Sequence, residues 1–496
     1  MAQTMPNFLQ KRAQLTPGRA AISYLDEQLT FKELYESSMN VAGKLAGLGM
    51  KKGSLTGVLV KNSLDSAVFL YALQLLGATA VMLNNRLSAG ELSYQLDDAK
   101  AEFLIYQESF ESLASESAAN ITAILTFPLE GLKDAETADF PLLEELNLDE
   151  VCTVMYTSGT TGKPKGVLQT YGNHFWSAAG SALNLGLSQE DTWLCAVPVF
   201  HISGYSILMR SIIYGMHIVL HSSFDSRQTL LDIEAKKVTI MSVVGTTLTR
   251  IIEELGDKRL PGTFRCMLLG GGPAPLPLLE ACRDRNIPVF QTYGMTETAS
   301  QSVTLSPEYS LAKLGSAGKP LFPVSLKIQH PDGAEAAAGE AGEILLKGPN
   351  VTPGYLNRHE ETAEKIIGGW LRTGDIGYVD GEGFLYVLDR RSDLIISGGE
   401  NIYPAEIESV LLSHPSVLEA GVTGIPDSEW GQVPAAFVVL KGDYEISPGG
   451  LRAFCQEKLA KYKVPREIYF ARELPRNASN KLLRRKLPEL IGEAPK

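Results

Sequence analysis

Short apolar runs alternate with amphipathic runs along much of this chain, and that alternation limits its fold more than any other feature. Residues 55–60 and 79–83 read as buried strands, and residues 64–76 between them read as a helix. Ser88 and Glu91 then form a capping box at the start of another helix. The alternation returns in the middle of the chain, where residues 238–244 and 287–292 read as strands and residues 245–255 read as a helix. Because a helix joins each strand to the next, the pattern predicts an α/β fold with parallel sheets covered by helices.

Glycine clusters come soon after several of the predicted strands. Gly159, Gly270 and Gly294 each follow one such strand. In sheets of this kind, ligands bind at the carboxyl ends of the strands. These three positions are therefore candidate edges of a ligand site.

The sequence changes character after about Ser310. Glycines now punctuate short strands, which predicts a small antiparallel, β-barrel-like subdomain. A charged cluster at 389–393 separates two apolar runs, and we place the main domain boundary there. Residues 1–389 are expected to form an N-terminal domain that holds this subdomain and two parallel-sheet α/β subdomains. Residues 390–496 are expected to form a small, mobile α+β C-terminal domain.

Composition excludes several classes of protein. The 496 residues carry a formal net charge of −12, so a global basic field for nucleic acid is absent. Only residues 458–486 are strongly basic. They form either a solvated face or a local surface that binds phosphates. The 5 cysteines include no C-x-x-C pair, which favours free thiols in a reducing compartment.

Signals for secretion and for membrane insertion also bear on where the protein acts. Residues 1–21 lack the apolar core of a secretory signal. The longest apolar stretch, residues 71–83, is too short to span a bilayer. We therefore expect a cytoplasmic protein that acts on small molecules, binds no nucleic acid and does not insert into a membrane.

The strongest local signal is the string YTSGTTGKPKG at residues 156–166. Its glycines let backbone N–H groups converge, its hydroxyls add donors and its lysines add charge, which together indicate a polyphosphate-binding loop. Pro164 follows Lys163 where a Walker A loop has Ser or Thr, and the glycine spacing also differs. An ordinary P-loop kinase or GTPase is therefore disfavoured.

This string resembles the signature loop of the adenylate-forming superfamily, which includes acyl-CoA synthetases, luciferases and the adenylation domains of peptide synthetases. The superfamily's other motifs have counterparts in the same order, at residues 293–298, 373–375, 388–406 and 475–485. The resemblance implies ATP, Mg²⁺ and CoA as ligands, and a carboxylic acid that is activated as an acyl-adenylate before a thiol accepts it. It also implies a set of ATP-binding residues: Thr157, Ser158, Gly159, Thr160, Thr161, Lys163, Lys165, Gly271, Gly272, Tyr293, Gly294, Met295, Thr296, Asp375, Arg390 and Lys481.

The catalytic candidates each have a chemical reason. Glu297 can hold the Mg²⁺ that bridges the ATP phosphates, since a hard cation prefers carboxylate oxygen, and Thr296 can donate to the α-phosphate. Asp375 has two oxygens that can accept from both ribose hydroxyls. The superfamily uses the lysine at the position of Lys481 to orient the carboxylate and the α-phosphate and to stabilise their charge. Asn480 replaces the usual glycine before that lysine, and asparagine also tolerates left-handed geometry.

The second step is implied by the same resemblance. In the superfamily, the C-terminal domain swings about a hinge between the two steps, which removes the lysine and builds a tunnel for the pantetheine of CoA. Ser392 occupies the hinge position. Gly398, Gly399 and Glu400 lie in the loop expected to contact CoA.

The resemblance is closer to one family within the superfamily, the 2-succinylbenzoate–CoA ligases of menaquinone biosynthesis. It is carried by residues 170–174, 198–204, 269–279, 291–301 and 475–483. It implies activation of the succinyl carboxylate of 2-succinylbenzoate. The expected substrate-binding residues are His201, Ser203, Gly270, Thr298 and Ser302. The segments expected to line the acid pocket, residues 201–205, 270–272 and 298–302, contain no Arg or Lys. The second carboxylate is therefore expected to rest on Ser203, Ser300, Gln301, Ser302, backbone N–H groups and waters.

Other interpretations stay open at this point. The acid could be another aryl or medium-chain carboxylate, which substrate competition would reveal. A carrier protein could replace CoA as the acceptor, or the adenylate could be oxidised as in luciferases. A catalytically inactive nucleotide-binding scaffold is disfavoured by the intact set Glu297, Asp375, Arg390 and Lys481. The family precedent is compatible with a homo-oligomer.

Overall fold

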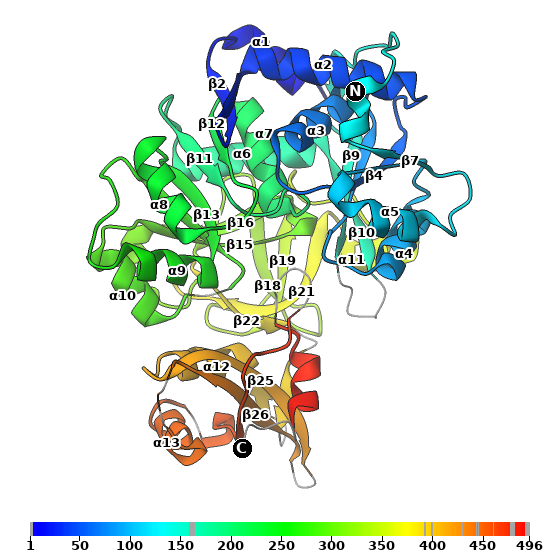
Figure 1. Ribbon diagram of the computed structural model, residues 1–496. Coiled ribbons are helices and arrows are strands. Elements are labelled where there is room, and N and C mark those ends of the chain that lie inside the picture. Colours follow the sequence, from blue (N-terminus) through cyan, green and yellow to red (C-terminus); the bar gives the residue numbers. More distant parts are fainter. Residues whose placement is uncertain are drawn as a thin grey trace.

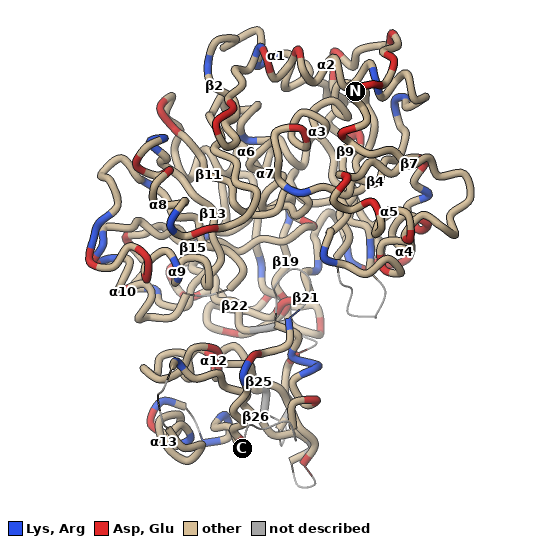
Figure 2. The backbone as a smooth tube through the Cα atoms, in the orientation of Figure 1, with Lys and Arg blue, Asp and Glu red and all other residues tan. Residues whose placement is uncertain are grey.

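The computed structural model describes residues 3–157, 164–272, 274–390, 393–397, 400–427, 430–442, 444, 446–459, 461–476 and 482–491. A larger N-terminal part holds three large sheets and one two-stranded sheet, and a smaller C-terminal part lies at one end of it, next to the third large sheet (Figure 1). Lysines and arginines are interspersed with acidic residues over both parts (Figure 2).

The first sheet has six strands in the order β10-β9-β5-β4-β6-β7. They are β10 (Lys165–Thr170), β9 (Val151–Thr157), β5 (Thr79–Met82), β4 (Leu55–Leu59), β6 (Phe103–Tyr106) and β7 (Leu125–Pro128). All are parallel except β10, which runs antiparallel to β9. Its helices are α3 (Leu64–Leu76), α4 (Ala89–Ala99) and α5 (Glu111–Ala118). The predicted capping box is confirmed, since the Ser88 and Glu91 side chains cap each other's backbone N–H groups at 3.4 and 2.9 Å.

The second sheet has nine strands in the order β17-β16-β15-β14-β13-β11-β12-β2-β3. They are β17 (Lys319–Pro320), β16 (Ser300–Leu305), β15 (Val289–Met295), β14 (Cys266–Gly270), β13 (Ile240–Val244), β11 (Thr192–Cys195), β12 (His217–Leu220), β2 (Ala20–Tyr24) and β3 (Glu27–Thr30). The six strands from β15 to β2 are parallel. Its helices include α8 (Ser226–Ala235), α9 (Gly245–Leu255) and α10 (Leu276–Asp284). The predicted α/β organisation is thus confirmed.

The largest hydrophobic core joins these two sheets through helices. The helices that contribute are α1 (Phe8–Leu15), α2 (Phe31–Gly47), α3, α6 (Tyr171–Leu185) and α7 (Ile202–Tyr214). Almost every residue of α3 is buried, so this helix is covered on all sides. Two buried hydrogen bonds tie it to α7: Tyr71 donates to the Leu208 carbonyl at 2.8 Å, and Gln74 donates to the Tyr205 hydroxyl at 2.9 Å.

The third sheet is antiparallel, as predicted for the region after Ser310. It contains β18 (Ser325–Gln329), β19 (Gly342–Lys347), β20 (Ile366–Ile367), β21 (Trp370–Val379) and β22 (Leu385–Arg390), with α11 (His359–Lys365) beside it. The pairings of the described strands run from β18 to β20 and β22 without returning to β18, so they form an open sheet.

The C-terminal part is a separate α+β unit. Its sheet contains β23 (Ile395–Ser397), β24 (Glu400–Ile402), β25 (Val417–Asp427), β26 (Gly431–Leu440) and β27 (Glu467–Phe470). Helices α12 (Pro404–Leu412) and α13 (Pro448–Lys458) contribute to its own core. A short pair, β1 (Thr4–Pro6) with β8 (Glu145–Asn147), completes the described strands.

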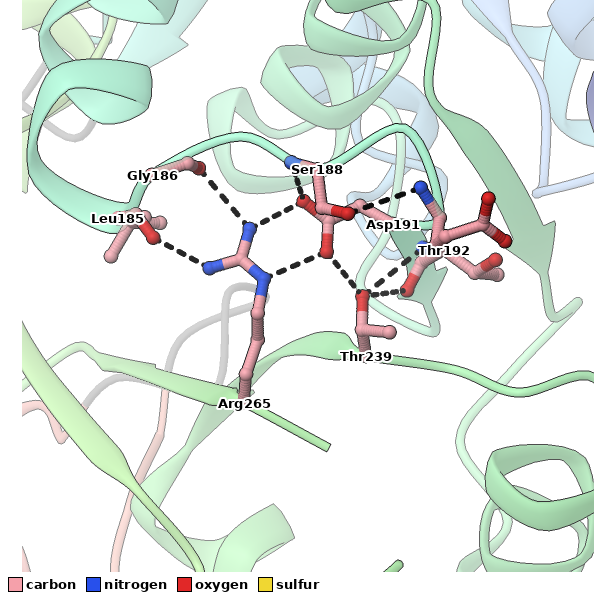
Figure 3. Close-up of polar contacts among 8 residues, drawn as sticks. Leu185, Gly186, Ser188, Asp191, Thr192, Thr239 and Arg265 are labelled. Carbon is pink, nitrogen blue, oxygen red and sulfur yellow. Dashed lines mark hydrogen bonds and ion pairs between the residues drawn. The ribbon is translucent and has the colours of Figure 1, made fainter. Parts of the chain in front are cut away.

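An ion pair lies at the amino ends of β11 and β14, and Figure 3 shows its contacts. Arg265, just before β14, donates from Nε and Nη2 to both carboxylate oxygens of Asp191 at 2.7 and 2.5 Å. Thr239 and the Ser188 N–H donate to the same carboxylate, each at 2.8 Å. Burial raises the pKa of Asp191, but the hydrogen bonds from Arg265, Ser188 and Thr239 outweigh it and hold the pKa below its usual value. The cluster joins the starts of β11 and β14 to the end of α6, because Arg265 also donates to the Leu185 carbonyl.

Two further observations concern the whole chain. All five cysteines are free thiols and all are buried. Among the residues that the structure describes, no helix is both long enough and apolar enough to cross a membrane.

Candidate active site

The β15–β16 hairpin carries an unbroken run of candidate residues, Tyr293–Thr298, and also Ser302. Its turn is a short 3₁₀ helix, η3 (Thr296–Thr298). The sequence predicted that the strand before Gly294 ends at 292, but β15 continues to Met295, with a register shift between Tyr293 and Gly294. A Cβ on Gly294 would overlap the backbone carbonyl of Ser300 on the facing strand, so only glycine fits. The hairpin therefore brings nucleotide-side and acid-side candidates within a few residues of each other.

Tyr293 and Asp375 meet although they lie far apart in the sequence. The Tyr293 hydroxyl donates to the Asp375 carboxylate at 2.7 Å, and Asp375 is 7% exposed. Asp375 lies on β21, directly opposite Arg390 on β22 in the antiparallel register. Three residues predicted to bind ATP are thus brought together where the second and third sheets meet, Tyr293 and Asp375 by a hydrogen bond and Arg390 by backbone register.

Glu297 lies on η3 and faces a cation. The Tyr355 hydroxyl donates to Glu297 Oε1 at 3.2 Å, and the Lys165 ammonium lies 5.9 Å from the centre of the Tyr355 ring. Lys165 also forms an ion pair with Glu361 of α11. Burial and the Lys365 ammonium lower the pKa of Lys165, whereas the charge of Glu297 opposes that shift. Sequence analysis did not single out Tyr355, because nothing near it in the sequence marks it as a partner of Glu297.

The segment between β9 and β10 is held at both ends by α4. The Tyr156 hydroxyl donates to Asp98 at 2.9 Å, and the Tyr94 hydroxyl donates to the Pro164 carbonyl at 3.2 Å. Arg358 pairs with the same Asp98 carboxylate. Thr157 and Lys165, the flanking ATP-binding candidates, are direct partners across the β9–β10 pair.

The glycine run 270–272 ends β14 at the carboxyl edge of the second sheet. Gly271 has a φ of +91°, which favours glycine, and no atom lies within 4 Å of a Cβ built on Gly272. Gly270 would meet only the Thr292 methyl, at 3.6 Å. The edge therefore leaves backbone open to a ligand, as the predicted roles of these glycines require.

The acid-side candidates surround the turn after η3. His201 is the N-cap residue of α7, and Ser203 is exposed in its first turn. Ser302 is fully buried and accepts from Asn350 at 3.3 Å. The Thr298 hydroxyl lies 3.1 and 3.0 Å from the carbonyl oxygens of Met295 and Ser300, so it closes the turn itself.

That turn has an unusual backbone. Ala299 and Ser300 have φ values of 49° and 105°, a region that non-glycine residues rarely adopt. Ser177 donates to the Ala299 carbonyl at 2.6 Å, and Ser206 lies 3.4 Å from the Ser300 hydroxyl. Such strain persists only where the surroundings hold it, and it is most common at functional sites.

Arg210 is the residue of this region that the sequence analysis missed. It lies on α7, is 1% exposed, and donates from Nη2 to Ser300 Oγ at 3.4 Å and to Gln301 Oε1 at 3.1 Å. Its guanidinium carbon lies 5.1 Å from the Trp193 ring. Among the described residues no carboxylate pairs with it, and its Nε is buried without a hydrogen-bond partner. The segments expected to line the acid pocket contain no Arg or Lys, yet the fold places this cation against two of their side chains.

The charge of Arg210 affects the protonation of a neighbouring histidine. Burial, and then the charge of Arg210, lower the pKa of His174 to about 3, so that imidazole is neutral at physiological pH. The sequence feature that could have identified Arg210 is its position as a lone arginine in the apolar run 205–214. Such a residue is seldom buried unless something pairs with it.

Several predicted residues lie outside the described part of the chain: Ser158, Gly159, Thr160, Thr161, Lys163, Ser392, Gly398, Gly399 and Lys481. Glu400 begins β24, where its backbone pairs with Ser397. Among the described residues, no group of three or more His, Cys, Asp or Glu gathers to hold a metal ion. Glu297 is the carboxylate that the sequence assigned to Mg²⁺, and one protein carboxylate suits an ion held mainly by phosphate oxygens.

Comparison with known proteins covers nearly the whole chain. Residues 9–356 match the AMP-binding enzyme family, and residues 406–481 match the AMP-binding enzyme C-terminal domain. The chain is 58% identical over 490 residues to 2-succinylbenzoate–CoA ligase of Geobacillus kaustophilus (strain HTA426), covering 98% of each chain.

Solved structures of a second relative, o-succinylbenzoate CoA synthetase (MenE) of Bacillus subtilis, are similar at 51% identity. Its complex with the acyl-adenylate intermediate OSB-AMP aligns with a TM-score of 0.93, covering 98% of each chain. Its complex with ATP and magnesium ion aligns at 0.92, over 98% of this chain and all of that chain (100%). A double mutant bound to the product analogue OSB-NCoA aligns at only 0.77, although it covers 98% of this chain and 99% of that chain. The arrangement of this chain is therefore closer to the acyl-adenylate complex than to the product-analogue complex.

Motifs, fold and full-length similarity agree, and the chain belongs to the AMP-binding enzymes and, within them, to the 2-succinylbenzoate–CoA ligase family.

Proposed function

We propose that this protein joins 2-succinylbenzoate to CoA with ATP as the energy source, through an acyl-adenylate, in menaquinone biosynthesis. The observation that carries the proposal is the β15–β16 hairpin. It places Tyr293 against Asp375 on the nucleotide side, Glu297 at its turn, and Ser300 against the buried Arg210 on the acid side. A site of this kind can hold a nucleotide and a dicarboxylic acid next to each other.

In the first step, an oxygen of the succinyl carboxylate attacks the α-phosphorus of ATP, and the bond from that phosphorus to the pyrophosphate oxygen breaks. Asp375 would accept from the ribose hydroxyls, and Lys165 would face the phosphates. Lys481 would lie between the two anionic reactants, orienting them and stabilising the charge that develops. The products are the acyl-adenylate and pyrophosphate.

Glu297 is the residue proposed to hold Mg²⁺. Its carboxylate lies at the turn of the hairpin, where it accepts from the Tyr355 hydroxyl at 3.2 Å. When bound, the ion neutralises the phosphate oxygens and makes pyrophosphate a better leaving group. Thr296 would donate to the α-phosphate from the same turn.

In the second step, the CoA thiol loses its proton to water and its sulfur attacks the acyl carbon, and the bond from that carbon to the AMP oxygen breaks. The products are 2-succinylbenzoyl-CoA and AMP. The C-terminal domain, which we take to begin at residue 390, would turn about Ser392 between the steps and bring residues 398–400 toward CoA.

Ser392→Pro is expected to block that turn, because proline fixes φ near −65° and removes a backbone donor. Adenylate formation, measured as pyrophosphate release without CoA, should survive, while thioester formation should stall. Equal slowing of both steps would contradict the hinge assignment. Ser392→Ala serves as the control, since it leaves the backbone free.

Arg210 is the proposed partner of the second carboxylate. Its Nη2 contacts Ser300 Oγ, and Ser206 Oγ lies at the same distance from that oxygen. Ser300 Oγ can accept from both groups while its own proton points to a ligand. A buried cation lacking a carboxylate among the described residues favours an anionic ligand nearby.

The decisive experiment compares acids. ATP-dependent pyrophosphate release and thioester formation would be measured with 2-succinylbenzoate, benzoate, octanoate, palmitate and acetate. We expect a strong preference for 2-succinylbenzoate with its CoA thioester as product. A preference for another acid would leave the adenylation chemistry and overturn the substrate. Adenylate without transfer to CoA would point to a carrier protein as the acceptor.

The proposal also covers the cellular location and the oligomeric state of the protein. We expect the enzyme in the cytoplasm, where ATP and CoA are available. The family precedent is compatible with a homo-oligomer, which sedimentation would reveal.

A further inference from the structure

Two ion pairs of the C-terminal domain flank the segment that carries Lys481. Arg476, before the segment, donates to Glu419 of β25 at 2.6 Å. Arg484, after it, donates from Nε and Nη2 to the two carboxylate oxygens of Glu408 on α12, at 2.8 and 2.7 Å. Arg484 Nη1 also donates to Asp393 at 3.0 Å.

The base of the segment is closed by the backbone. Arg476 and Leu482 form an antiparallel bridge, and the Leu483 N–H donates to the Pro475 carbonyl at 2.8 Å. Leu482 rests against Gly421 of β25, where a Cβ would come within 3.1 Å of its methyl group. The described residues on the two sides of positions 477–481 are thus paired with each other.

Arg484 joins the base of the segment to the start of the C-terminal domain. Asp393 directly follows the predicted hinge residue Ser392. Glu408 also accepts the Val422 N–H of β25 at 2.8 Å, so β25 holds its carboxylate in addition to the arginine. One guanidinium therefore connects the chain after the hinge, helix α12 and the lysine segment.

The pair differs from an ordinary surface ion pair. The Arg484 and Glu408 side chains are 18% and 11% exposed, and their contact is bidentate. A bidentate contact that is largely withdrawn from water is directional and strong. An exposed ion pair, by contrast, contributes little to the stability of the fold.

We propose that Arg484 is a positioning residue for the adenylation step. It fastens the segment of Lys481 to the hinge side of the C-terminal domain, so that domain orientation sets the position of the lysine. The inference rests on the proposed function, in which Lys481 acts only in the first step. Loss of Arg484 should therefore slow acyl-adenylate formation and spare transfer to CoA.

The test measures the two half-reactions of the full-length protein separately. The first is single-turnover pyrophosphate release from ATP and 2-succinylbenzoate without CoA. The second is thioester formation from CoA and chemically prepared acyl-adenylate. For Arg484→Met we expect the first rate to fall about 10- to 100-fold, as for a misplaced catalytic group, and the second to change less than about twofold.

Two further variants sharpen the result. Arg484→Lys keeps the charge but loses the bidentate geometry, so its adenylation rate should lie between those of the wild type and Arg484→Met. Arg466→Met is the matched control, since it removes an ion pair to Asp427 (2.9 Å) in the same domain and should leave both rates unchanged. Thermal unfolding of each variant tests whether it is folded. If Arg484→Met unfolds at a lower temperature than the wild type, the half-reaction rates of Arg484→Lys decide the role of Arg484.

Equal slowing of both half-reactions, or no slowing, would overturn the inference. A wild-type protein that forms no adenylate from 2-succinylbenzoate would instead contradict the proposed substrate. The same comparison is then made with the acid that the wild type does activate, and the split between the half-reactions still decides the role of Arg484.

Discussion

Replacing Arg210 with glutamine should cost activity on 2-succinylbenzoate at least about 100-fold in kcat/KM, because truncating one partner of a buried charge pair costs several kcal/mol. The loss should be specific to the diacid. 4-Oxo-4-phenylbutanoate, which lacks only the ring carboxylate, should be turned over by Arg210→Gln about as well as by the wild type. The wild type should strongly prefer the diacid, and the variant should lose that preference.

A purely structural role for Arg210 predicts a different pattern. The guanidinium contacts Ser300, Gln301 and the Trp193 ring, so its loss could simply loosen the turn. In that case both acids would lose activity by the same factor, which would contradict a role in carboxylate binding. Arg210→Lys should recover part of the discrimination, since it restores the charge without the planar donor geometry.

The second large effect concerns stability. Asp191→Asn should lower the free energy of unfolding by about 3 kcal/mol, the lower end of the range for breaking a buried ion pair. The Asp191 side chain is 1% exposed and Arg265 is 28% exposed, so the arginine keeps some access to water after the change. The measurement is urea denaturation at neutral pH, followed by tryptophan fluorescence.

A surface ion pair provides the control for this prediction. Lys52 and Glu150 lie 2.8 Å apart, with side chains 53% and 35% exposed. Lys52→Met should therefore change stability by less than about 1 kcal/mol. If Asp191→Asn costs no more than Lys52→Met, the cluster in Figure 3 does not fasten the second sheet.

Much of the fold could be predicted because its elements are locally encoded. Residues 64–76 and 245–255 form helices with the predicted bounds, since each has an apolar pattern and clear boundaries. Strand ends were less certain: β13 begins at Ile240, two residues later than predicted, and β15 extends to Met295. The extension depends on pairing with β16, which the local sequence does not reveal.

The same distinction between local sequence and tertiary packing applies to the candidate site. Tyr293, Glu297 and Asp375 belong to short motifs, so the sequence identifies them. Arg210 could not be assigned that way, because its importance comes from α7 packing beside β16. Tyr355 is a similar case, since only the fold brings its hydroxyl to Glu297.

The burial of every cysteine has a consequence for an enzyme that handles activated acyl groups. Burial raises the pKa of Cys195 to about 12 and that of Cys455 to about 11, so both remain protonated at physiological pH. A thiolate at the surface would compete with CoA for the adenylate and could exchange with the finished thioester. With all five thiols withdrawn from solvent, the protein gives its own product no sulfur to acylate and gives oxidised CoA no partner for a mixed disulfide.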